Sequence, residues 1–568
     1  MKKYLLYTML VSLTLLASCS KELETTPTDK TTSDVVFSTG SGAYAAINGI
    51  YRYMYMTGYT PSWGAENFGY SSILHCYDMV GEDMAKRDPG SQWFFYDHLF
   101  WVRGEITSTS DRPIGWWTFF YKIIMSSNNI IAYVPNAVAS EQLKNNVIGQ
   151  ALALRAFAYY NLVNIYQLTY DGNLNAKGVP IYTEPSDKNT IGKGRGTVKQ
   201  VYDQINTDLD LAIEKLKNAE AQKNKSNIDL YTAYGLKARV ALMMRDWTTA
   251  KTMAQKALEK PGLAMMSTTE LTGGFNSINN EWLWGAQVLD AQATGVSSFM
   301  SHMDAAEGGG YAKNSGVLVS RWIYDLMPNN DIRKQKWFTA PTMDWRVVTQ
   351  AQMDEMGVGT RQVYLKYWES QQNDLNSQNP SQGFPYSSNS YMQLKFRMKG
   401  PGNWANDLIY MRAAEMYLII AEASCMRGEY GDARTALNTL MASRVPGYDA
   451  SIFPNGNVQT VRSYVDDATY AARNLLDEVL MQRRIELWGE GFRLFDLTRQ
   501  KIAIDRQFPE TNFLATLGEE NGKAIPDYGT CAVKHSYAAD KWAYVMMLPM
   551  KEFTSNPNFT PDDQNPAW

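Results

Sequence analysis

The residue with the clearest chemistry is Cys19, which ends a Leu-Ala-Ser-Cys run at positions 16–19. A bacterial lipoprotein signal peptidase cuts before such a cysteine once its thiol carries a diacylglycerol. Lys2 and Lys3 precede an apolar stretch over residues 4–16 that is too short to span a bilayer. We predict a signal peptide over 1–18 and lipidation of Cys19, which anchors the mature chain through acyl groups such as palmitate. The alternative is an ordinary secretion signal with a chance cysteine.

A second group of residues could bind a sugar without reacting with it. A pyranose exposes C–H groups on one face and hydroxyls around its rim, which aromatic rings and polar side chains can cover. Residues 60–101 supply this mixture among glycines and prolines. Packing or a turn competes with ligand contact for each single residue. We predict ligand contacts first at Trp93 and Asp83, then at Trp63, Tyr77, Arg87, Phe95 and Trp101, and in a second stretch at Tyr311, which lies near His302 and Asp304.

Residues for catalysis are less evident. Glu486 and Glu490 could form an acid–base pair, but Arg483 and Arg493 alternate with them at spacings of three and four, which is typical of structural ion pairs. The sequence has no nucleophile, phosphate-loop or metal-ligand motif, and its four histidines are not spaced as ligands. We predict no enzyme activity, no cofactor and no metal site, and calcium is left open. A glycoside hydrolase is harder to exclude, because its two carboxylates need not be close in sequence.

The composition of the 568 residues is that of a globular protein, with 45% hydrophobic and 20% charged residues. The net charge is −4 and no block of Lys or Arg stands out, which disfavours a nucleic-acid partner. Cys76, Cys425 and Cys531 have neither CxxC nor Cys/His spacing, so we expect small buried residues in place of disulfides or zinc ligands.

Periodic apolar residues predict a chain built mainly of helices. We expect a flexible tether over 19–33 and folded structure from residue 34 onward. Apolar positions at helical spacing then predict helices over residues 41–56, 116–134, 143–167 and 198–216.

Two helix pairs have the alanine spacing of tetratricopeptide (TPR) repeats. The first pair covers 231–244 and 247–259, with Ala238 and Ala250 at contact positions. The second covers 410–444, with a turn at 428–431. Because any helical hairpin favours alanine at contacts, a non-repeat helical protein is the alternative. Between the pairs, residues 262–403 read as a loop-rich subdomain with a short strand over 281–287 and a mobile triple glycine at 308–310.

Near the end of the chain, residues 482–499 read QRRIELWGEGFRLFDLTR, which resembles the signature of the SusD/RagB family of outer-membrane nutrient-binding lipoproteins. Gln482 stands where the family usually has Glu, and Pro566-Ala567-Trp568 replaces the commoner Pro-Gly-Tyr. Further matches follow in order along nearly the whole mature chain: Arg155-Ala156-Phe157, Asp246-Trp247 with Ala250, Glu281-Trp282, 410–415 running into 421–423, Leu548-Pro549, Asn556-Pro557 and 564–566.

The resemblance implies a mainly α, SusD-like fold with a TPR-type helix-pair scaffold, an irregular loop-rich subdomain and short strands. It divides residues 34–568 into scaffold at about 34–261 and 404–500, the loop-rich part at 262–403 and a C-terminal segment at 501–568. It also implies a lipid-anchored protein that faces the cell exterior at the outer membrane. There it would capture oligosaccharides and deliver them to a SusC-like TonB-dependent transporter for nutrient uptake. A peptide or glycoprotein ligand, as the RagB branch allows, is the alternative, and ligand residues do not carry over one by one.

Overall fold

The computed structural model describes residues 36–58, 64–86, 93–94, 97, 109, 111–222, 224–306, 310–313, 317–340, 391–461, 467–505, 536–537 and 544–566. The predicted signal peptide, Cys19 and the tether lie outside these ranges. Among the helices inside them, none is both long and apolar enough to cross a membrane.

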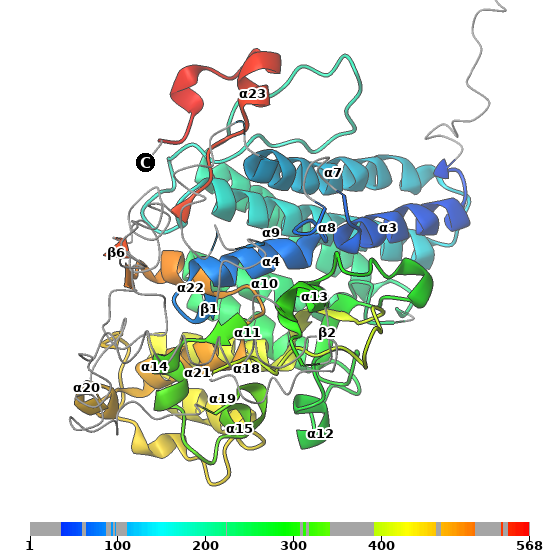
Figure 1. The fold of residues 1–568 in the computed structure, drawn as a ribbon. Coiled ribbons are helices and arrows are strands. Elements are labelled where there is room, and N and C mark those ends of the chain that lie inside the picture. The colour runs from blue at the N-terminus through cyan, green and yellow to red at the C-terminus, as the bar shows by residue number, and fades with distance from the viewer. Residues whose placement is uncertain are drawn as a thin grey trace, which may run out of the picture.

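The N-terminal part is a group of helices around one buried helix, α8 (Glu141–Tyr166), beside α3 (Gly40–Tyr55) and α7 (Asp111–Tyr133) (Figure 1). Ser140 caps α8, because its side chain accepts a hydrogen bond from the Leu143 N–H. Every residue of α8 from Asn146 to Tyr166 is buried, so this helix is enclosed on all sides. A short 3₁₀ turn, η1 (Val134–Asn136), joins α7 to α8.

The two predicted helix pairs are present and lie against each other. The first is α10 (Leu230–Met244) and α11 (Trp247–Leu258), and the second is α18 (Ala413–Met426) and α19 (Tyr430–Met441). Ala250, Ala254 and Ala257 on α11 are fully buried, and α11 packs on α18. Ahead of the first pair, α9 (Val198–Lys217) packs along α8. The mainly helical fold predicted from periodicity is therefore confirmed.

Two elements differ from the prediction. Residues 408–412 form a strand, β4 (Leu408–Arg412), which pairs antiparallel with β2 (Trp282–Ala286), so the predicted helix begins only at Ala413. The interval 60–101, in which no helix was predicted, contains the helix α4 (Tyr70–Val80). All eleven residues of α4 are buried, so polar and apolar residues mix along it and no amphipathic stripe marks it in the sequence.

The described parts of 262–403 hold short elements connected by loops. In chain order they are α12 (Thr268–Leu271), β2, η2 (Asp290–Gln292), α13 (Phe299–Met303), η3 (Tyr311–Lys313), β3 (Val317–Val319), α14 (Arg321–Leu326) and α15 (Ile332–Trp337). β3 pairs antiparallel with β1 (Met84–Lys86), so this segment is joined to the end of α4. The proposed subdomain boundaries stay a prediction.

The C-terminal segment returns to the helical scaffold. Its elements are η6 (Ala450–Ile452), α20 (Asp467–Ala471), α21 (Leu475–Glu486), α22 (Arg493–Gln500), the β5–β6 ribbon (Ile504–Asp505 and Ser536–Tyr537), α23 (Met550–Ser555) and η9 (Pro561–Asp563). Near the chain end, Asn565 Nδ2 donates to the carbonyl oxygens of Tyr166 and Met546, at 2.8 Å each. Arg195 Nη1 donates to the Asp563 carbonyl and to Asn565 Oδ1. We call Arg195, Asp563 and Asn565 the C-terminal clasp, which ties the tail to the end of α8.

Candidate functional site

Two of the predicted ligand residues, Trp93 and Tyr311, meet in the structure although they are far apart in sequence. Their ring centroids are 5.6 Å apart at 65°, an edge-to-face contact. His302 stacks on Tyr311 at 5.0 Å, and Phe68 stacks on His302 at 5.3 Å. Trp93 and Tyr311 are half-buried, whereas His302 and Phe68 are buried beneath them. We call these four residues the ring ladder.

Local backbone geometry positions the ring ladder. His302 lies on α13, where its Nε2 is 2.8 Å from the Ala65 carbonyl oxygen. The Tyr311 N–H donates to Ser301 Oγ at 3.2 Å. Gly310 makes this approach possible, because a Cβ added there would lie 1.8 Å from Ser301 Oγ.

Trp93 is positioned by its neighbour Phe94, which is fully buried and has a positive φ of 54°. A non-glycine residue in this conformation needs support from its surroundings. The Phe94 N–H donates to the carboxylate of Glu66, and the Phe94 ring packs edge-on against His75 and His302. The buried and hydrogen-bonded Phe94 therefore fixes the backbone that carries the Trp93 indole.

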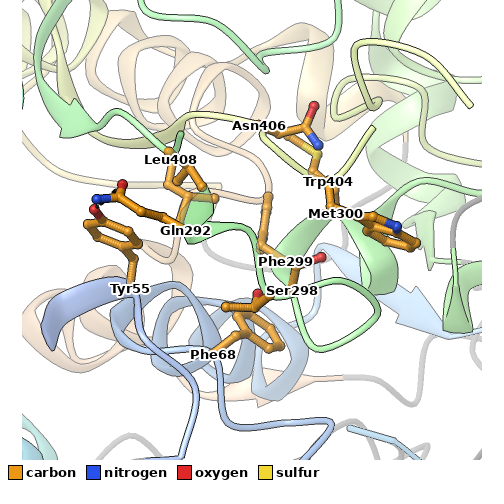
Figure 2. Close-up of a pocket in the computed structure, with 11 residues that line it drawn as sticks. Tyr55, Phe68, Gln292, Ser298, Phe299, Met300, Trp404, Asn406 and Leu408 are labelled. Carbon is orange, nitrogen blue, oxygen red and sulfur yellow. Dashed lines mark hydrogen bonds between the residues drawn. The ribbon is translucent and has the colours of Figure 1, made fainter. Parts of the chain in front are cut away.

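A small hollow with a void of about 20 Å³, partly open to solvent, borders the ring ladder at Phe68 (Figure 2). Phe68 belongs to both, since it also lines the hollow. Tyr55, from the end of α3, and Gln292, from η2, lie next to each other in the close-up, and the Tyr55 hydroxyl donates to Gln292 Oε1 at 2.9 Å. Apolar lining comes from Val288, Phe299, Met300 and Leu408, and hydroxyl groups come from Thr294 and Ser298.

The remaining residues of the hollow, Trp404 and Asn406, follow a Gly-Pro-Gly-Asn run at 400–403. Trp404 is half-buried. Asn406 is held in place because its Oδ1 accepts from the Lys399 N–H at 2.9 Å and its Nδ2 donates to the Asn403 carbonyl at 2.7 Å. Among the described residues, no Lys, Arg, His, Asp or Glu lines the hollow itself, but Arg52 lies beside it, with its guanidinium 4.8 Å from the Tyr55 ring centroid. The rings and amides of the hollow can contact a group that presents hydroxyls.

Asp83 and Tyr77 are not presented to a ligand. Asp83 is 4% exposed, and Arg484 Nε donates to both of its carboxylate oxygens at 3.0 Å. Tyr77 is 1% exposed and packs against Trp116 and Phe495. Both side chains contribute to the interior, and we no longer propose them as ligand contacts. Four other candidates, Trp63, Arg87, Phe95 and Trp101, lie outside the described residues.

The charged segment 478–499 forms a buried ion network, as predicted, but its geometry differs from the prediction. α21 ends at Glu486, and positive φ at Gly489 and Gly491 turns the chain, so Glu486 and Glu490 do not share a helix. Glu486 pairs with Arg412, Arg444 and Arg333 at 2.6, 2.7 and 3.0 Å. Burial alone would raise the pKa of Glu486, but the three guanidinium groups outweigh it and hold this pKa well below its ordinary range.

The partners of Glu490 lie outside α21 as well. It pairs with Lys395 at 2.6 Å and with Arg412 at 2.7 Å. The side chains of Lys395 and Arg412 are fully buried. Since every charge in this network has a partner inside the protein, its role is structural.

Metal ligands were not predicted, and within the described ranges no three His, Cys, Asp or Glu side chains are grouped to hold a metal ion. Cys76 and Cys425 are buried and free, as expected.

Sequence reasoning missed Phe68, Gln292, Tyr55 and Trp404. The signal used for Trp93, a ring in a Gly- and Pro-containing stretch, also marks Trp404.

Comparison with known proteins identifies the family of the chain. Residues 70–242 match a family model described as starch-binding and associating with the outer membrane, and residues 276–568 match the SusD family model. A SusD-like protein of Formosa agariphila is 22% identical over 528 residues, which cover 90% of this chain and 94% of that protein.

Solved structures share the fold over nearly the whole chain. A SusD-like carbohydrate binding protein of Bacteroides vulgatus has a TM-score of 0.68 at 25% identity, covering 93% of this chain and 99% of that chain. Surface glycan-binding protein A of Bacteroides thetaiotaomicron has a TM-score of 0.62 at 17% identity, with coverage of 93% and 99%. Since the SusD model alone matches residues 276–568, more than half of the 568 residues, the chain belongs to the SusD/RagB family.

Proposed function

We propose that this protein captures oligosaccharides at the cell surface without modifying them. The observation that carries the proposal is the edge-to-face pair of Trp93 and Tyr311, half-buried above a buried stack of His302 and Phe68. Two supported ring faces can cover the C–H face of a sugar at little entropic cost. The carbohydrate-binding relative of known structure and the starch-binding family model support the same class of ligand.

Affinity at such a surface should be modest, because a flexible oligosaccharide loses conformational freedom for few buried contacts. Retention would then depend on neighbouring sites and on a partner protein. We propose a SusC-like TonB-dependent transporter as that partner, to which the captured oligosaccharide is delivered. Acylated Cys19 would hold the mature chain at the outer membrane, and the leader sequence and the family description support this location.

The test is a glycan-array screen of the mature chain from residue 20, followed by isothermal titration with the best binder. Trp93→Ala should weaken binding about tenfold, because a ring contact contributes on the order of 1 kcal/mol or more. The matched control, Trp247→Ala, removes a half-buried indole at the start of α11 and should bind as the wild type does. Unchanged affinity in Trp93→Ala would rule out the ring ladder as the binding site.

The same samples separate the rival functions. Product analysis after long incubation should find the oligosaccharide intact, whereas turnover by the purified protein would favour a surface hydrolase. A glycoprotein or peptide should compete with oligosaccharide only if it uses the same rings. Binding of peptide that free oligosaccharide cannot displace would favour the peptide-ligand alternative.

A further inference from the structure

A buried arginine contacts the segment that carries Trp93. Arg112, in the first turn of α7, is 2% exposed. Its Nη2 pairs with Glu66 Oε2 and with Asp97 Oδ2, at 2.6 Å each, and both carboxylates are buried. We call Arg112, Glu66 and Asp97 the Arg112 cluster. Through one guanidinium group it joins three parts of the chain: the residues before α4, the residues around Phe94 and the start of α7.

The Arg112 cluster holds Phe94, the residue that follows Trp93. Glu66 uses one carboxylate oxygen, Oε1, to accept from the Phe94 N–H and the other, Oε2, to pair with Arg112. The Arg112 guanidinium carbon also lies 5.6 Å from the centroid of the Phe94 ring, within the range of a cation–π contact. Phe94 has a positive φ, which a non-glycine residue keeps only with support from its surroundings. These contacts therefore fix the direction in which the chain presents Trp93.

Arg112 itself is fixed to the helical core. Its Nη1 donates to Cys76 Sγ of α4 at 2.7 Å. The carbonyl oxygen of the next residue, Pro113, accepts from the Tyr166 hydroxyl at the end of α8, at 2.5 Å. A planar guanidinium can serve two carboxylates and a thiol at once, whereas an ammonium group on a flexible stem has no such fixed geometry. The position of Trp93 therefore depends on how α7 is held on the core.

We propose that Arg112 is a positioning residue for ligand binding. At 2% exposed it cannot reach an oligosaccharide, and it acts through Glu66 and Phe94. Their contacts hold Trp93 at its edge-to-face angle against Tyr311. A ring that is already in place loses little freedom when a sugar packs on it, so affinity depends on this support. The inference rests on the proposed function and deepens it, because it assigns part of the affinity to a buried charge cluster.

Arg112→Lys is the test, because it keeps the charge between the two carboxylates and removes the guanidinium geometry. It should weaken oligosaccharide binding about threefold to tenfold in isothermal titration. The probes are an α1,4-linked glucose heptasaccharide, since residues 70–242 match a family model described as starch-binding, and the best binder of the glycan array. If Arg112 acts through Trp93, the double variant Trp93→Ala/Arg112→Lys should bind as Trp93→Ala alone does.

The matched control is Arg499→Lys. Arg499 of α22 is buried and also bridges two carboxylates, with Glu422 at 2.5 Å and Asp496 at 2.7 Å. The same chemical change is therefore made in a second buried cluster. Arg499→Lys should lose stability, as Arg112→Lys does, and should keep wild-type affinity.

Glu66→Gln is the second variant, in case Arg112→Lys fails to fold. Its amide has an oxygen at one end only, so an N–H group would face either Phe94 or Arg112, and binding should weaken about threefold. Fluorine NMR of fluorotryptophan-labelled protein observes the ring directly, and the Trp93 signal is the one missing from Trp93→Phe. That signal should shift or broaden in Arg112→Lys and Glu66→Gln and stay unchanged in Arg499→Lys.

Wild-type affinity in Arg112→Lys and Glu66→Gln would overturn the inference, and so would an unchanged Trp93 signal in these variants. Losses that multiply in Trp93→Ala/Arg112→Lys would overturn it too, because Arg112 would then act elsewhere. These outcomes leave the proposed function in place as long as Trp93→Ala alone weakens binding. If wild-type protein binds no oligosaccharide, or if Trp93→Ala binds as the wild type does, the proposed function itself fails, and this inference fails with it.

Discussion

The side chain of Asp83, a residue predicted to bind ligand, is buried and forms ion pairs inside the protein. Its carboxylate contacts Arg484 and Arg493, and its backbone carbonyl accepts from Trp488 Nε1 at 2.8 Å. Breaking a buried ion pair on one side leaves an uncompensated charge, which costs about 3 kcal/mol or more. Asp83 therefore stabilises the fold.

Asp83→Asn should accordingly lower the free energy of unfolding by about 3 kcal/mol while folded protein binds oligosaccharide as the wild type does. Chemical denaturation and isothermal titration measure the two effects separately. Asp290→Asn, on an exposed residue of η2, is the control and should change neither. Lost affinity with unchanged stability would return Asp83 to the ligand site.

The buried carboxyl group of Asp78 makes the stability of the fold depend on pH. Burial raises its pKa to about 7, although the N–H groups of Gly491 and Arg493, which donate to its carboxylate, act in the opposite direction. The folded state binds this proton more tightly than the unfolded state, so protonation of Asp78 stabilises the fold. This stabilisation is fully present below the ordinary pKa of 3.8. It is lost as the pH rises through about 7.

Asp78→Asn should remove this contribution, so that the free energy of unfolding of the wild type falls relative to that of the variant as the pH rises from 4 to 8, a window set by the two pKa values. Urea denaturation across that range measures it. Asp562→Asn, on an exposed residue, should leave the wild-type pH profile in place. A constant difference between Asp78→Asn and the wild type would show that Asp78 does not titrate there.

At the scale of elements, the contact between Gly310 and α13 fixes the ring ladder. A methyl group at residue 310 would clash with Ser301 Oγ and displace Tyr311, whose N–H bonds to that oxygen. Gly310→Ala should therefore weaken oligosaccharide binding several-fold, up to about tenfold, with little change in the circular dichroism spectrum. Gly431→Ala, where an added Cβ meets no atom within 4 Å, is the matched control. Wild-type affinity in Gly310→Ala would show that binding does not depend on the position of Tyr311 beside Ser301.

Elements with a clear periodicity or cap could be predicted from the sequence, and those set by tertiary context could not. α9 was predicted within a residue because Thr197 caps it and its apolar side is regular. α4 was missed because it is buried on all sides, and Tyr410 to Arg412 form a strand only because β2 lies beside them. Similarly, Trp93 and Tyr311 were recognised as candidates, but the contact between them depends on the fold.

At the scale of the whole molecule, ion pairs and hydrogen bonds join parts that are distant in sequence. Arg239 of α10 pairs with Glu415 of α18 at 2.7 Å, and both side chains are buried. The C-terminal clasp connects residues 563–565 to the 177–195 loop and to α8.

Asn565→Ala should lower the free energy of unfolding by about 2 kcal/mol, because it removes two buried hydrogen bonds, to the carbonyl oxygens of Tyr166 and Met546. Thermal and urea denaturation measure this loss. Asn558→Ala removes one exposed hydrogen bond from the same tail, to the Gly192 carbonyl, and should cost far less. Equal losses in the two variants would contradict a special role for the clasp.

The clasp also has a consequence for biogenesis. Residues near 565 leave the ribosome long after α8 does. The core helix therefore acquires its last partners only when synthesis of the chain is complete. A chain cut short in synthesis would leave the end of α8 uncovered and open to proteases.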